Sequence, residues 1–274
     1  LKLDPRAMAI LREGDPKVSK PCIKGGVLDA ELICEDHPPP QFQPVCCNVG
    51  SADGTSPWPL VPRQGSAWLL DGRLQALCQG LSPPLTVFEH HDAPVLACSA
   101  RPQLQVSWIG HEGWGARTSE ELSLGSFVCE YAGEVLPDAE AESLGSGRDA
   151  YLFNLTTPKQ CRALGAQVES FGEEDHPVYV IDAYVKGNVG RFLNHACGPS
   201  REANVSPVYV YVMDQDVVDA RLPRVAFFAN RKIAAGEELR YDYGMPPEAV
   251  LDTDGTVRQQ RCLCGSEVCR GRIY

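Results

Sequence analysis

The stretches RFLNHAC at residues 191–197 and EELRYDYG at residues 237–244 decide the fold of this chain. Two weaker segments precede them, GWGAR at 113–117 and YLF at 151–153. A GWG turn and an aromatic strand each occur in many folds, so these two carry little information alone. A cysteine cluster, CLCGSEVC at 262–269, follows the last segment. The order of the five segments is therefore more informative than any one of them.

The sequence around these segments predicts a mostly β fold of short strands and long functional loops. From Gln105 onward, short β-like runs alternate with Gly-rich turns. Strands are expected at 106–109, 127–131, 151–155, 178–181, 208–213, 225–228 and 239–241, with a helix near 138–144 and one helical turn before His195. Residues 1–104 are Pro-rich and irregular, which predicts a separate region at 1–104; the division of the rest into 105–247 and 248–274 is implied by the family resemblance given below. The polar segment at 156–177 is interpreted as an inserted loop.

Composition limits the classes of function. The 274 residues carry a net charge of −11, with a sequence pI near 5.0. Nucleic-acid binders usually carry a basic footprint, so direct nucleic-acid binding is not expected. An acidic surface attracts basic partners such as Lys/Arg-rich tails, although acidity also confers solubility by itself. No apolar run approaches the roughly 20 residues of a membrane span, so no membrane partner is expected.

The cysteines favour metal over disulfides. Three of the twelve lie in the C-x-C-x4-C cluster at 262–269. Neighbours that close rarely pair with each other, but they suit a tetrahedral thiolate site. A reducing, intracellular compartment is the expected setting.

Taken together, the segments resemble the SET-domain lysine methyltransferases, and within them the Suvar-type enzymes that modify histone H3 at lysine 9. FVCEYAGEV at 127–135, and IDA at 181–183 followed by Gly187-Asn188, add to the resemblance, which covers about 105–272. It implies a compact β fold in which the segments at 194–195 and 241–243 cross as a pseudoknot. The SET domain would span 105–247, after a pre-SET-like region and before a post-SET tail.

The resemblance also implies a site for S-adenosylmethionine. The residues expected to form it are Glu112, Gly113, Trp114, Gly115, Tyr151, Arg191, Asn194 and His195. His195 alone would be interpreted as a structural histidine, and its place within RFLNHAC favours the cofactor role. Methyl transfer requires a neutral lysine amine, whereas a free lysine has a pKa of about 10.4. An aromatic channel would lower that pKa by burial and align the amine.

Two tyrosines are the expected catalytic residues. The Tyr243 hydroxyl would order the amine and the methyl group, and Tyr241 would limit the space around them. Expected channel residues are Phe153, Lys186 and Phe228. Phe227 and Phe228 also suit the core of a buried strand, and Lys186 stands where relatives often have Tyr. In this family, Tyr at the position of Tyr241 accompanies early termination, so monomethylation, extending slowly to the dimethyl state, is predicted.

Cys197, Cys262, Cys264 and Cys269 supply four thiolates, the number that a closed structural zinc requires. Similar enzymes carry such a post-SET zinc. Their pre-SET module holds three zincs on nine cysteines, but only six cysteines precede residue 100 here, with no C-x-C pair. Two interpretations of that region stay open. One is a single metal site that draws on Cys34, Cys46, Cys47, Cys78, Cys98, His37, His90 or His91; the other is buried apolar thiols.

The sequence therefore predicts a nuclear, chromatin-associated protein lysine methyltransferase, with the H3 tail and lysine 9 as the favoured substrate. A non-histone protein substrate remains an alternative, as does a non-catalytic SET module that binds histone tails. Acidic residues of the 156–177 segment would line a groove for a basic tail or form a solvated loop.

Overall fold

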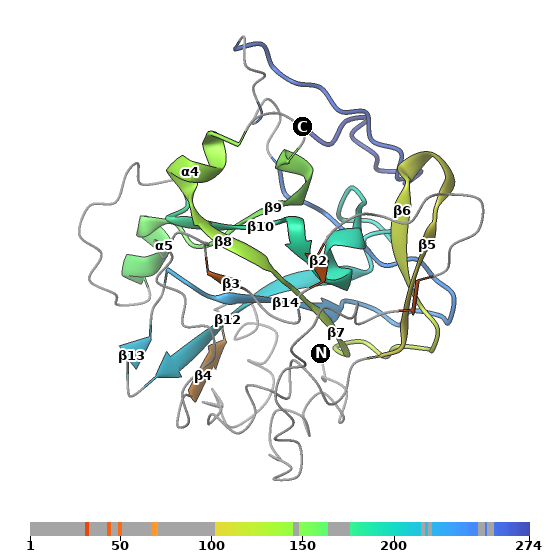
Figure 1. Cartoon of the computed structure of the whole chain (residues 1–274). Coiled ribbons are helices and arrows are strands. Elements are labelled where there is room, and N and C mark those ends of the chain that lie inside the picture. Colours follow the sequence, from red (N-terminus) through yellow and green to blue (C-terminus); the bar gives the residue numbers. More distant parts are fainter. Residues whose placement is uncertain are drawn as a thin grey trace.

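The computed structural model describes residues 102–144, 148–163, 176–214, 217–218, 221–245, 250 and 255–274, together with four short strands nearer the N-terminus (Figure 1). The N-terminal strands are β1 (Glu31–Leu32), β2 (Gln43–Pro44), β3 (Val49–Gly50) and β4 (Ala67–Leu70). The other strands are β5 (Leu104–Trp108), β6 (Trp114–Thr118), β7 (Phe127–Tyr131), β8 (Gly133–Pro137), β9 (Leu152–Asn154), β10 (Tyr179–Gly187), β11 (Asn194–His195), β12 (Val205–Asp214), β13 (Val217–Val218), β14 (Arg224–Ala229) and β15 (Arg240–Tyr241). Helices α4 (Asp138–Glu142) and α5 (Pro158–Ala163) and 3-10 turns η2 (Gly110–Glu112), η3 (Asp149–Tyr151) and η4 (Val189–Phe192) complete the described elements.

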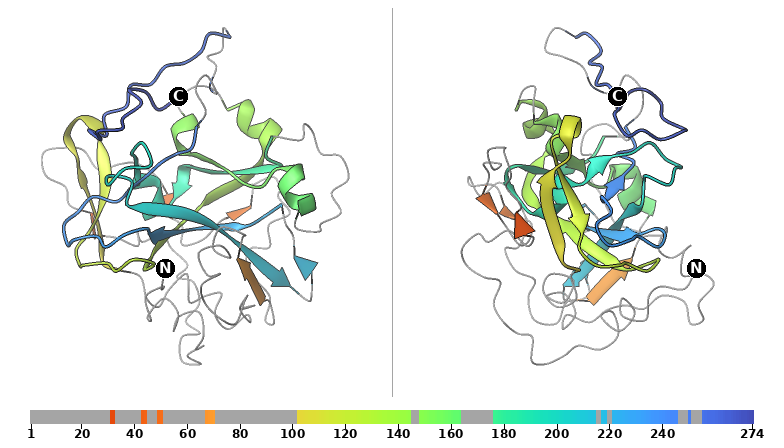
Figure 2. Two further views of the ribbon diagram at one scale, coloured as in Figure 1. Left: turned by 180° about the vertical axis from the view of Figure 1, so that it is seen from behind. Right: turned by 90° about the vertical axis from the view of Figure 1, so that its right-hand side faces the viewer.

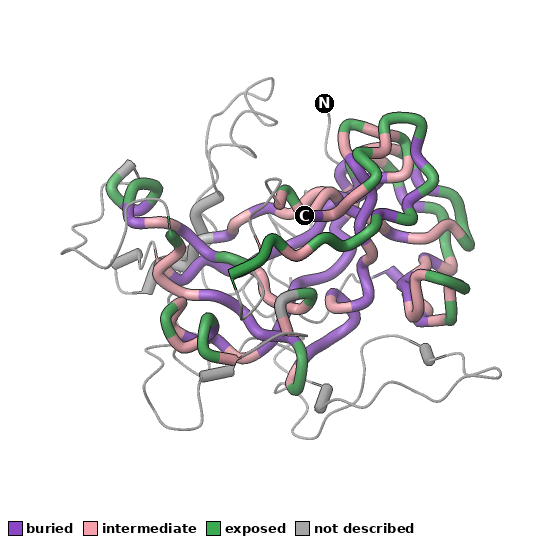
Figure 3. The backbone as a smooth tube through the Cα atoms, turned by 90° about the horizontal axis from the view of Figure 1, so that it is seen from above, coloured by how far each residue is buried: buried purple, intermediate pink, exposed green. Residues whose placement is uncertain are grey.

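One sheet forms the centre of the core. Its strands follow the order β13-β12-β14-β7, with β4 also paired to β12. Every residue of β7 and β14 is buried, in keeping with their apolar sequences FVCEY and RVAFFA. The two charges in these strands, Glu130 and Arg224, pair with each other, as buried charges must. Figure 3 shows this buried interior with exposed turns around it.

A second sheet joins β2, β10, β8 and β3, and β9 pairs with β10. β8 and β10 are antiparallel, but their register shifts between Asp182 and Gly187. Residues 183–186 therefore leave the β8 ladder, and the side chains of Tyr184 and Val185 are exposed there. The β5–β6 hairpin forms a separate antiparallel pair, to which β1 adds a parallel strand.

The pseudoknot that the resemblance implied is a parallel pairing of β11 with β15. Asn194 lies opposite Arg240, and His195 opposite Tyr241. The Ala196 N–H then donates to the Tyr241 carbonyl at 3.0 Å, which extends the pairing by one step. Two chain segments far apart in the sequence are thereby fixed beside each other.

After the pseudoknot, the described residues 255–274 form a C-terminal tail. In Figure 1 and in the left view of Figure 2, the tail lies beside the turn of the β5–β6 hairpin. Its regular pairing includes a bridge between Arg261 and Arg272. No helix among the described residues is long and apolar enough to span a membrane.

Most expected strands and the mostly β class are confirmed, and the expected helix near 138–144 is α4. Among the strands from residue 102 onward, β6, β8, β11 and β13 were not expected, and neither were β1–β4 nearer the N-terminus. The first part of the segment at 156–177 is helix α5 and not a loop, because Thr157 caps it: its Oγ accepts from the Gln160 N–H. Residues 164–175 lie outside the described residues, as do the cysteines and histidines before residue 100.

Candidate active site

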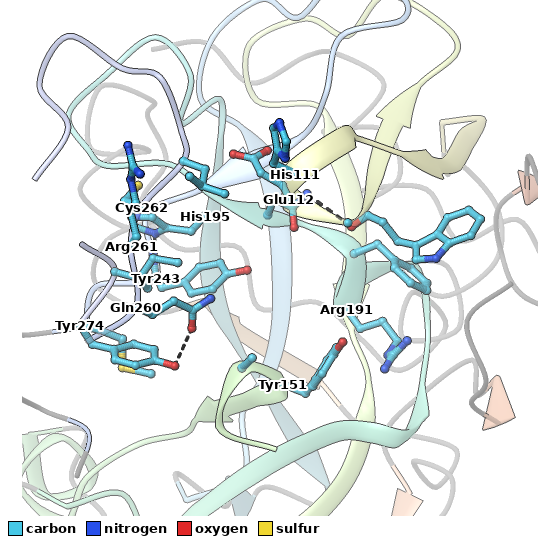
Figure 4. Close-up of a pocket in the computed structure, with 18 residues that line it drawn as sticks. His111, Glu112, Tyr151, Arg191, His195, Tyr243, Gln260, Arg261, Cys262 and Tyr274 are labelled. Atoms are coloured by element: carbon cyan, nitrogen blue, oxygen red, sulfur yellow. Dashed lines mark hydrogen bonds between the residues drawn. The ribbon is translucent and has the colours of Figure 1, made fainter. Parts of the chain in front are cut away.

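A cavity of about 390 Å³ opens between the β5–β6 turn, the pseudoknot and the tail (Figure 4). Of the eight residues expected to hold the cofactor, seven line it: Glu112, Gly113, Trp114, Tyr151, Arg191, Asn194 and His195. Tyr243 lines it as well, and its ring projects toward the middle of the cavity in Figure 4. Residues distant in sequence therefore converge on one concave surface, as a ligand site requires.

Gly115 does not line the cavity, although it was expected in the cofactor site. A Cβ at this position would lie 2.5 Å from Ile109 Cγ1, 2.8 Å from Asn194 Nδ2 and 2.9 Å from Glu238 Oε1. Glycine is therefore required for close packing behind the cavity wall. Gly115 lets Asn194 approach the hairpin, where the Asn194 amide donates to the Trp114 carbonyl at 3.4 Å and to Glu238 at 2.9 Å.

Tyr243 is held at both ends. Its hydroxyl donates to the Leu193 carbonyl at 3.0 Å, and its backbone N–H donates to His195 Nδ1 at 3.2 Å. Burial raises the pKa of Tyr243, so the phenol stays protonated at neutral pH. Its hydroxyl oxygen keeps acceptor capacity, so the group can orient a donor such as an amine but is a poor base.

The His195 ring contacts two other protein groups, the Tyr243 backbone and the Cys197 thiol. Desolvation lowers its pKa to about 4, which keeps the ring neutral. Because Nδ1 accepts from Tyr243, the ring proton belongs on Nε2, which lies 3.4 Å from Cys197 Sγ. His195 thus connects Tyr243 to the cysteine cluster while also lining the cavity.

Aromatic rings surround Tyr241. Its ring centroid lies 4.7 Å from Phe227, 4.7 Å from Tyr243 and 6.3 Å from Phe153. Burial holds the pKa of Tyr241 well above its usual range. Phe153, expected in the channel, belongs to this cluster. Phe228, also expected there, packs instead against Phe127 at 5.7 Å, because neighbouring residues of β14 point to opposite faces of the sheet.

Lys186 and Arg191 make charged contacts: Lys186 forms an ion pair, and Arg191 lies over an aromatic ring. Lys186 Nζ pairs with Glu134 at 2.9 Å, which places the expected channel residue in an ion pair between β10 and β8. The Arg191 guanidinium lies 4.4 Å from the Tyr151 ring centroid, and its Nε donates to the Ala183 carbonyl at 2.8 Å. Arg191 therefore fixes both the Tyr151 wall and the displaced part of β10.

Arg240 joins three parts of the site, although no sequence pattern had singled it out. Its guanidinium pairs with Glu112 from the hairpin turn and with Glu238 from the pseudoknot. It also donates to the Cys264 carbonyl of the tail at 3.4 Å. Burial raises the pKa of Glu112, and the Arg240 charge opposes that rise. The hairpin, pseudoknot and tail thus share one charged network beneath the cavity.

The four expected zinc ligands converge. The Sγ atoms of Cys197, Cys262, Cys264 and Cys269 all lie within 4.8 Å of one another. Cys197 and Cys262 are 3.7 Å apart, and tetrahedral zinc with Zn–S bonds of about 2.3 Å requires about 3.8 Å. Backbone N–H groups of Arg270 and Gly271 donate to Cys197 and Cys269, each at 3.3 Å, as thiolates require. The donor set therefore fits one structural zinc.

Sequence reasoning missed much of the cavity wall. The missed residues are His111, Ala150, Phe192, Met245, Gln260, Arg261, Leu263, Ile273 and Tyr274. Most belong to the tail, which has no periodic pattern that would reveal a face. Within the tail, the Tyr274 hydroxyl donates a hydrogen bond to Gln260 Oε1 at 2.6 Å. Figure 4 shows these two side chains on the tail side of the cavity, across from Tyr151.

Comparisons with known proteins agree with this geometry. Residues 113–244 match the family model described as SET domain. The chain is 39% identical over 172 residues to SUVH5 of Arabidopsis thaliana, described as a histone-lysine N-methyltransferase specific for H3 lysine 9. The match covers 63% of this chain but 18% of SUVH5, so the chain spans under a fifth of that relative's length.

Two solved structures are similar to most or all of the chain. The structure of Arabidopsis thaliana SUVH6 in complex with SAM matches with a TM-score of 0.59 and 26% identity, covering 100% of this chain and 56% of that one. KRYPTONITE in complex with mCHH DNA, an H3(1–15) peptide and SAH matches with a TM-score of 0.57 and 26% identity, covering 85% and 48%.

Proposed function

Because this chain contains a SET domain related to the Suvar-type H3 lysine-9 methyltransferases, we propose that it is a protein lysine methyltransferase that uses S-adenosylmethionine. One observation carries the proposal: Tyr243 projects into a cavity lined by seven of the eight residues expected to hold the cofactor. Its catalytic unit is proposed to span 105–247, with the zinc-binding tail at 248–274.

The chemistry divides between the cofactor and the chain. S-adenosylmethionine, when bound, supplies an activated methyl group on a positively charged sulfur. Glu112, Trp114, Asn194 and His195 would hold it on one side, with Tyr151 and Arg191 on the other. The cluster around Tyr241 excludes water and lowers the pKa of an incoming lysine, because burial disfavours its charged form. The Tyr243 hydroxyl oxygen accepts from the neutral amine and aligns it.

The proposed substrate is the histone H3 tail, with lysine 9 favoured, and the proposed product is mainly the monomethylated lysine. Support comes from SUVH5, described as specific for H3 lysine 9, and from KRYPTONITE, solved with an H3(1–15) peptide. Tyr241 supports early termination, because its buried hydroxyl takes volume that a methylated amine needs. A nuclear, chromatin-bound setting follows from this substrate, and a non-histone protein is the alternative.

The test is mass spectrometry of an H3-tail peptide incubated with the chain and S-adenosylmethionine. Parallel peptides have lysine 4, 9 or 27 replaced, and Tyr243→Phe is the matched control. We expect a mass increase of one methyl group that disappears only when lysine 9 is replaced. Methylation of another lysine would correct the substrate alone. A chain that binds the cofactor and methylates neither histones nor a wider set of proteins would refute the catalytic proposal.

A further inference from the structure

Asp242 stands between the two active-site tyrosines but lines neither the cavity nor the aromatic cluster. Its carboxylate accepts four hydrogen bonds. Two come from backbone N–H groups, Gly198 at 2.8 Å and Gly244 at 2.9 Å. The other two come from the Arg270 guanidinium, at 3.0 and 2.8 Å. All the bonds are of normal length, and the arginine pair is bidentate, the geometry that gives strength and direction together.

Each partner of Asp242 belongs to a different part of the site. Gly198 follows the zinc ligand Cys197, and Gly244 follows Tyr243 directly. Arg270 lies in the tail, directly after Cys269, and its own backbone N–H donates to Cys197 Sγ at 3.3 Å. The Arg270 residue is therefore fixed to the cysteine cluster through its backbone and to Asp242 through its side chain.

This ion pair differs from an ordinary surface pair. The side chains are 39% and 25% exposed for Arg270 and Asp242, whereas those of Lys232 and Glu121 in another pair are 68% and 58% exposed. Exposed pairs contribute little, while bidentate pairs within a network contribute measurably. Although burial would raise the pKa of Asp242, the bonds from Arg270 and the two amides lower it, so the carboxylate is charged at neutral pH.

We propose that Asp242 and Arg270 form a latch that holds the Tyr241–Tyr243 segment in its working position against the zinc-binding tail. Both are positioning residues for methyl transfer, and this inference rests on the proposed function. Tyr243 already has two anchors, at the Leu193 carbonyl and at His195. The latch is a third, attached to the backbone on both sides of the ring. Without it the segment pivots, and a displacement of about 1 Å at a reacting group costs about 100-fold in rate.

The test compares four single variants of the full chain and the Asp242→Asn/Arg270→Met double variant. Asp242→Asn removes the negative charge and replaces one acceptor oxygen with an NH2 group, which cannot accept, so the bidentate pair with Arg270 is lost. Arg270→Met keeps most of the side-chain volume and removes the charge, while Arg270→Lys keeps the charge and loses the fork. Lys232→Gln is the matched control, since it breaks the exposed pair with Glu121. Each variant is assayed for zinc per chain. Calorimetry gives the affinity and stoichiometry of S-adenosylhomocysteine binding. Single-turnover methylation is measured on the H3-tail peptide with no lysine replaced.

We expect Asp242→Asn and Arg270→Met each to lower the single-turnover rate by about 10- to 100-fold. Zinc content and cofactor stoichiometry should stay at one per chain, and cofactor affinity should change by less than about threefold, under 1 kcal/mol. Arg270→Lys should recover part of the rate. The Asp242→Asn/Arg270→Met double variant should be no slower than the slower single variant, because both remove one interaction.

Three results would overturn the latch. Unchanged rates in both variants would show that the pair does not position the tyrosines. Rates that fall in proportion to zinc content or cofactor stoichiometry would show a role in folding the tail alone. Fully additive losses would show that the two residues act independently. An inactive wild-type chain would instead refute the proposed function, which makes the two failures distinguishable.

Discussion

The SET body at 102–245 and the tail at 255–274 are stabilised by different kinds of interaction. The body buries a core of aliphatic and aromatic residues between paired strands. Over its described residues, the tail has isolated bridges in place of strands, and its buried residues Cys262 and Cys264 pack with Cys197 in a separate cluster. Apolar burial is non-directional and distributed, whereas a thiolate cluster concentrates stability at one point. Since both regions line the cavity, the site is built from a body with an apolar core and from a wall that carries the cysteine cluster.

The largest effect should come from a change that disturbs neither region. Tyr243→Phe removes one hydroxyl at the place where body and tail meet. Removing one positioned polar group at a reacting centre costs about 100- to 1000-fold in kcat. We expect a loss of that size, measured by peptide methylation, with the affinity for S-adenosylhomocysteine changed by less than about threefold, or under 1 kcal/mol. Activity within a few-fold of wild type would exclude Tyr243 as the catalytic tyrosine.

The next change separates the two regions. Cys262→Ser removes one zinc ligand, and the tail should leave the cavity, because formation of such a site and ordering of the chain are coupled. We expect loss of zinc and no detectable methylation. Cofactor affinity should fall by at least about 10-fold, the size of effect that changes around a metal site typically have. Far-UV circular dichroism should stay close to that of wild type, because the strands belong to the body.

Cys161→Ser is the matched control for Cys262→Ser. Cys161 is also a buried cysteine, but it lies on α5, outside the zinc cluster. Its replacement should leave zinc content and cofactor affinity at wild-type values. If Cys262→Ser unfolded the strands as well, body and tail would be one cooperative unit and the comparison would fail.

Gly115→Ala tests whether packing within the body sets the cavity. The added Cβ would meet Ile109, Asn194 and Glu238 at 2.5–2.9 Å. Overpacking of a close contact costs about 1–3 kcal/mol, which should appear as a lower free energy of unfolding in urea. Because Asn194 lines the cavity, cofactor affinity should fall too, while zinc content stays unchanged. Ser107→Ala, directly opposite on β5, adds no atoms and should leave both quantities close to wild type.

The contrast between body and tail also explains how much of the fold could be predicted from the sequence. The strands at 127–131 and 225–228 were expected because each is a short run of mainly apolar residues. β8 begins at Gly133 and β6 contains Gly115, so their glycines resembled turns. The pairing of β11 with β15 covers two residues on each strand and is set by tertiary contacts, so only the family resemblance indicated it.

For the site, the motifs located the body's share of the cavity and little of the tail's. Asn194 and Tyr243 stand in specific strings and Glu112 directly precedes the GWG segment, whereas Leu263 and Tyr274 line the cavity through contacts that no local pattern encodes. Arg240 was missed for a related reason. A surface arginine and a buried one that joins three elements look the same in sequence, and only the fold brings Glu112 and Glu238 to it.

The smallest change in rate should come from Tyr241→Phe, which tests the body's aromatic cluster alone. Tyr241 is 7% exposed and packs against Phe227 and Tyr243. Loss of its hydroxyl frees volume beside the amine and removes a group that would hold a water there. We expect the first methyl transfer to stay within a few-fold of wild type, while di- and trimethylated products increase over the time course in mass spectrometry.

Tyr179→Phe is the control for that shift, since Tyr179 is a partly buried tyrosine at the start of β10 that packs against the same core, whereas the rings around Tyr241 are those of Phe153, Phe227 and Tyr243. It should leave the product distribution unchanged. A wild-type chain that forms the trimethyl product as fast as the monomethyl one would refute the role of Tyr241 before any variant is made. If instead Cys262→Ser retained enough activity to measure and shifted the products as Tyr241→Phe does, the tail and not the cluster would set the available space. The number of methyl groups on the product therefore shows whether the aromatic cluster of the body or the tail limits methylation. A rate alone does not distinguish these two regions.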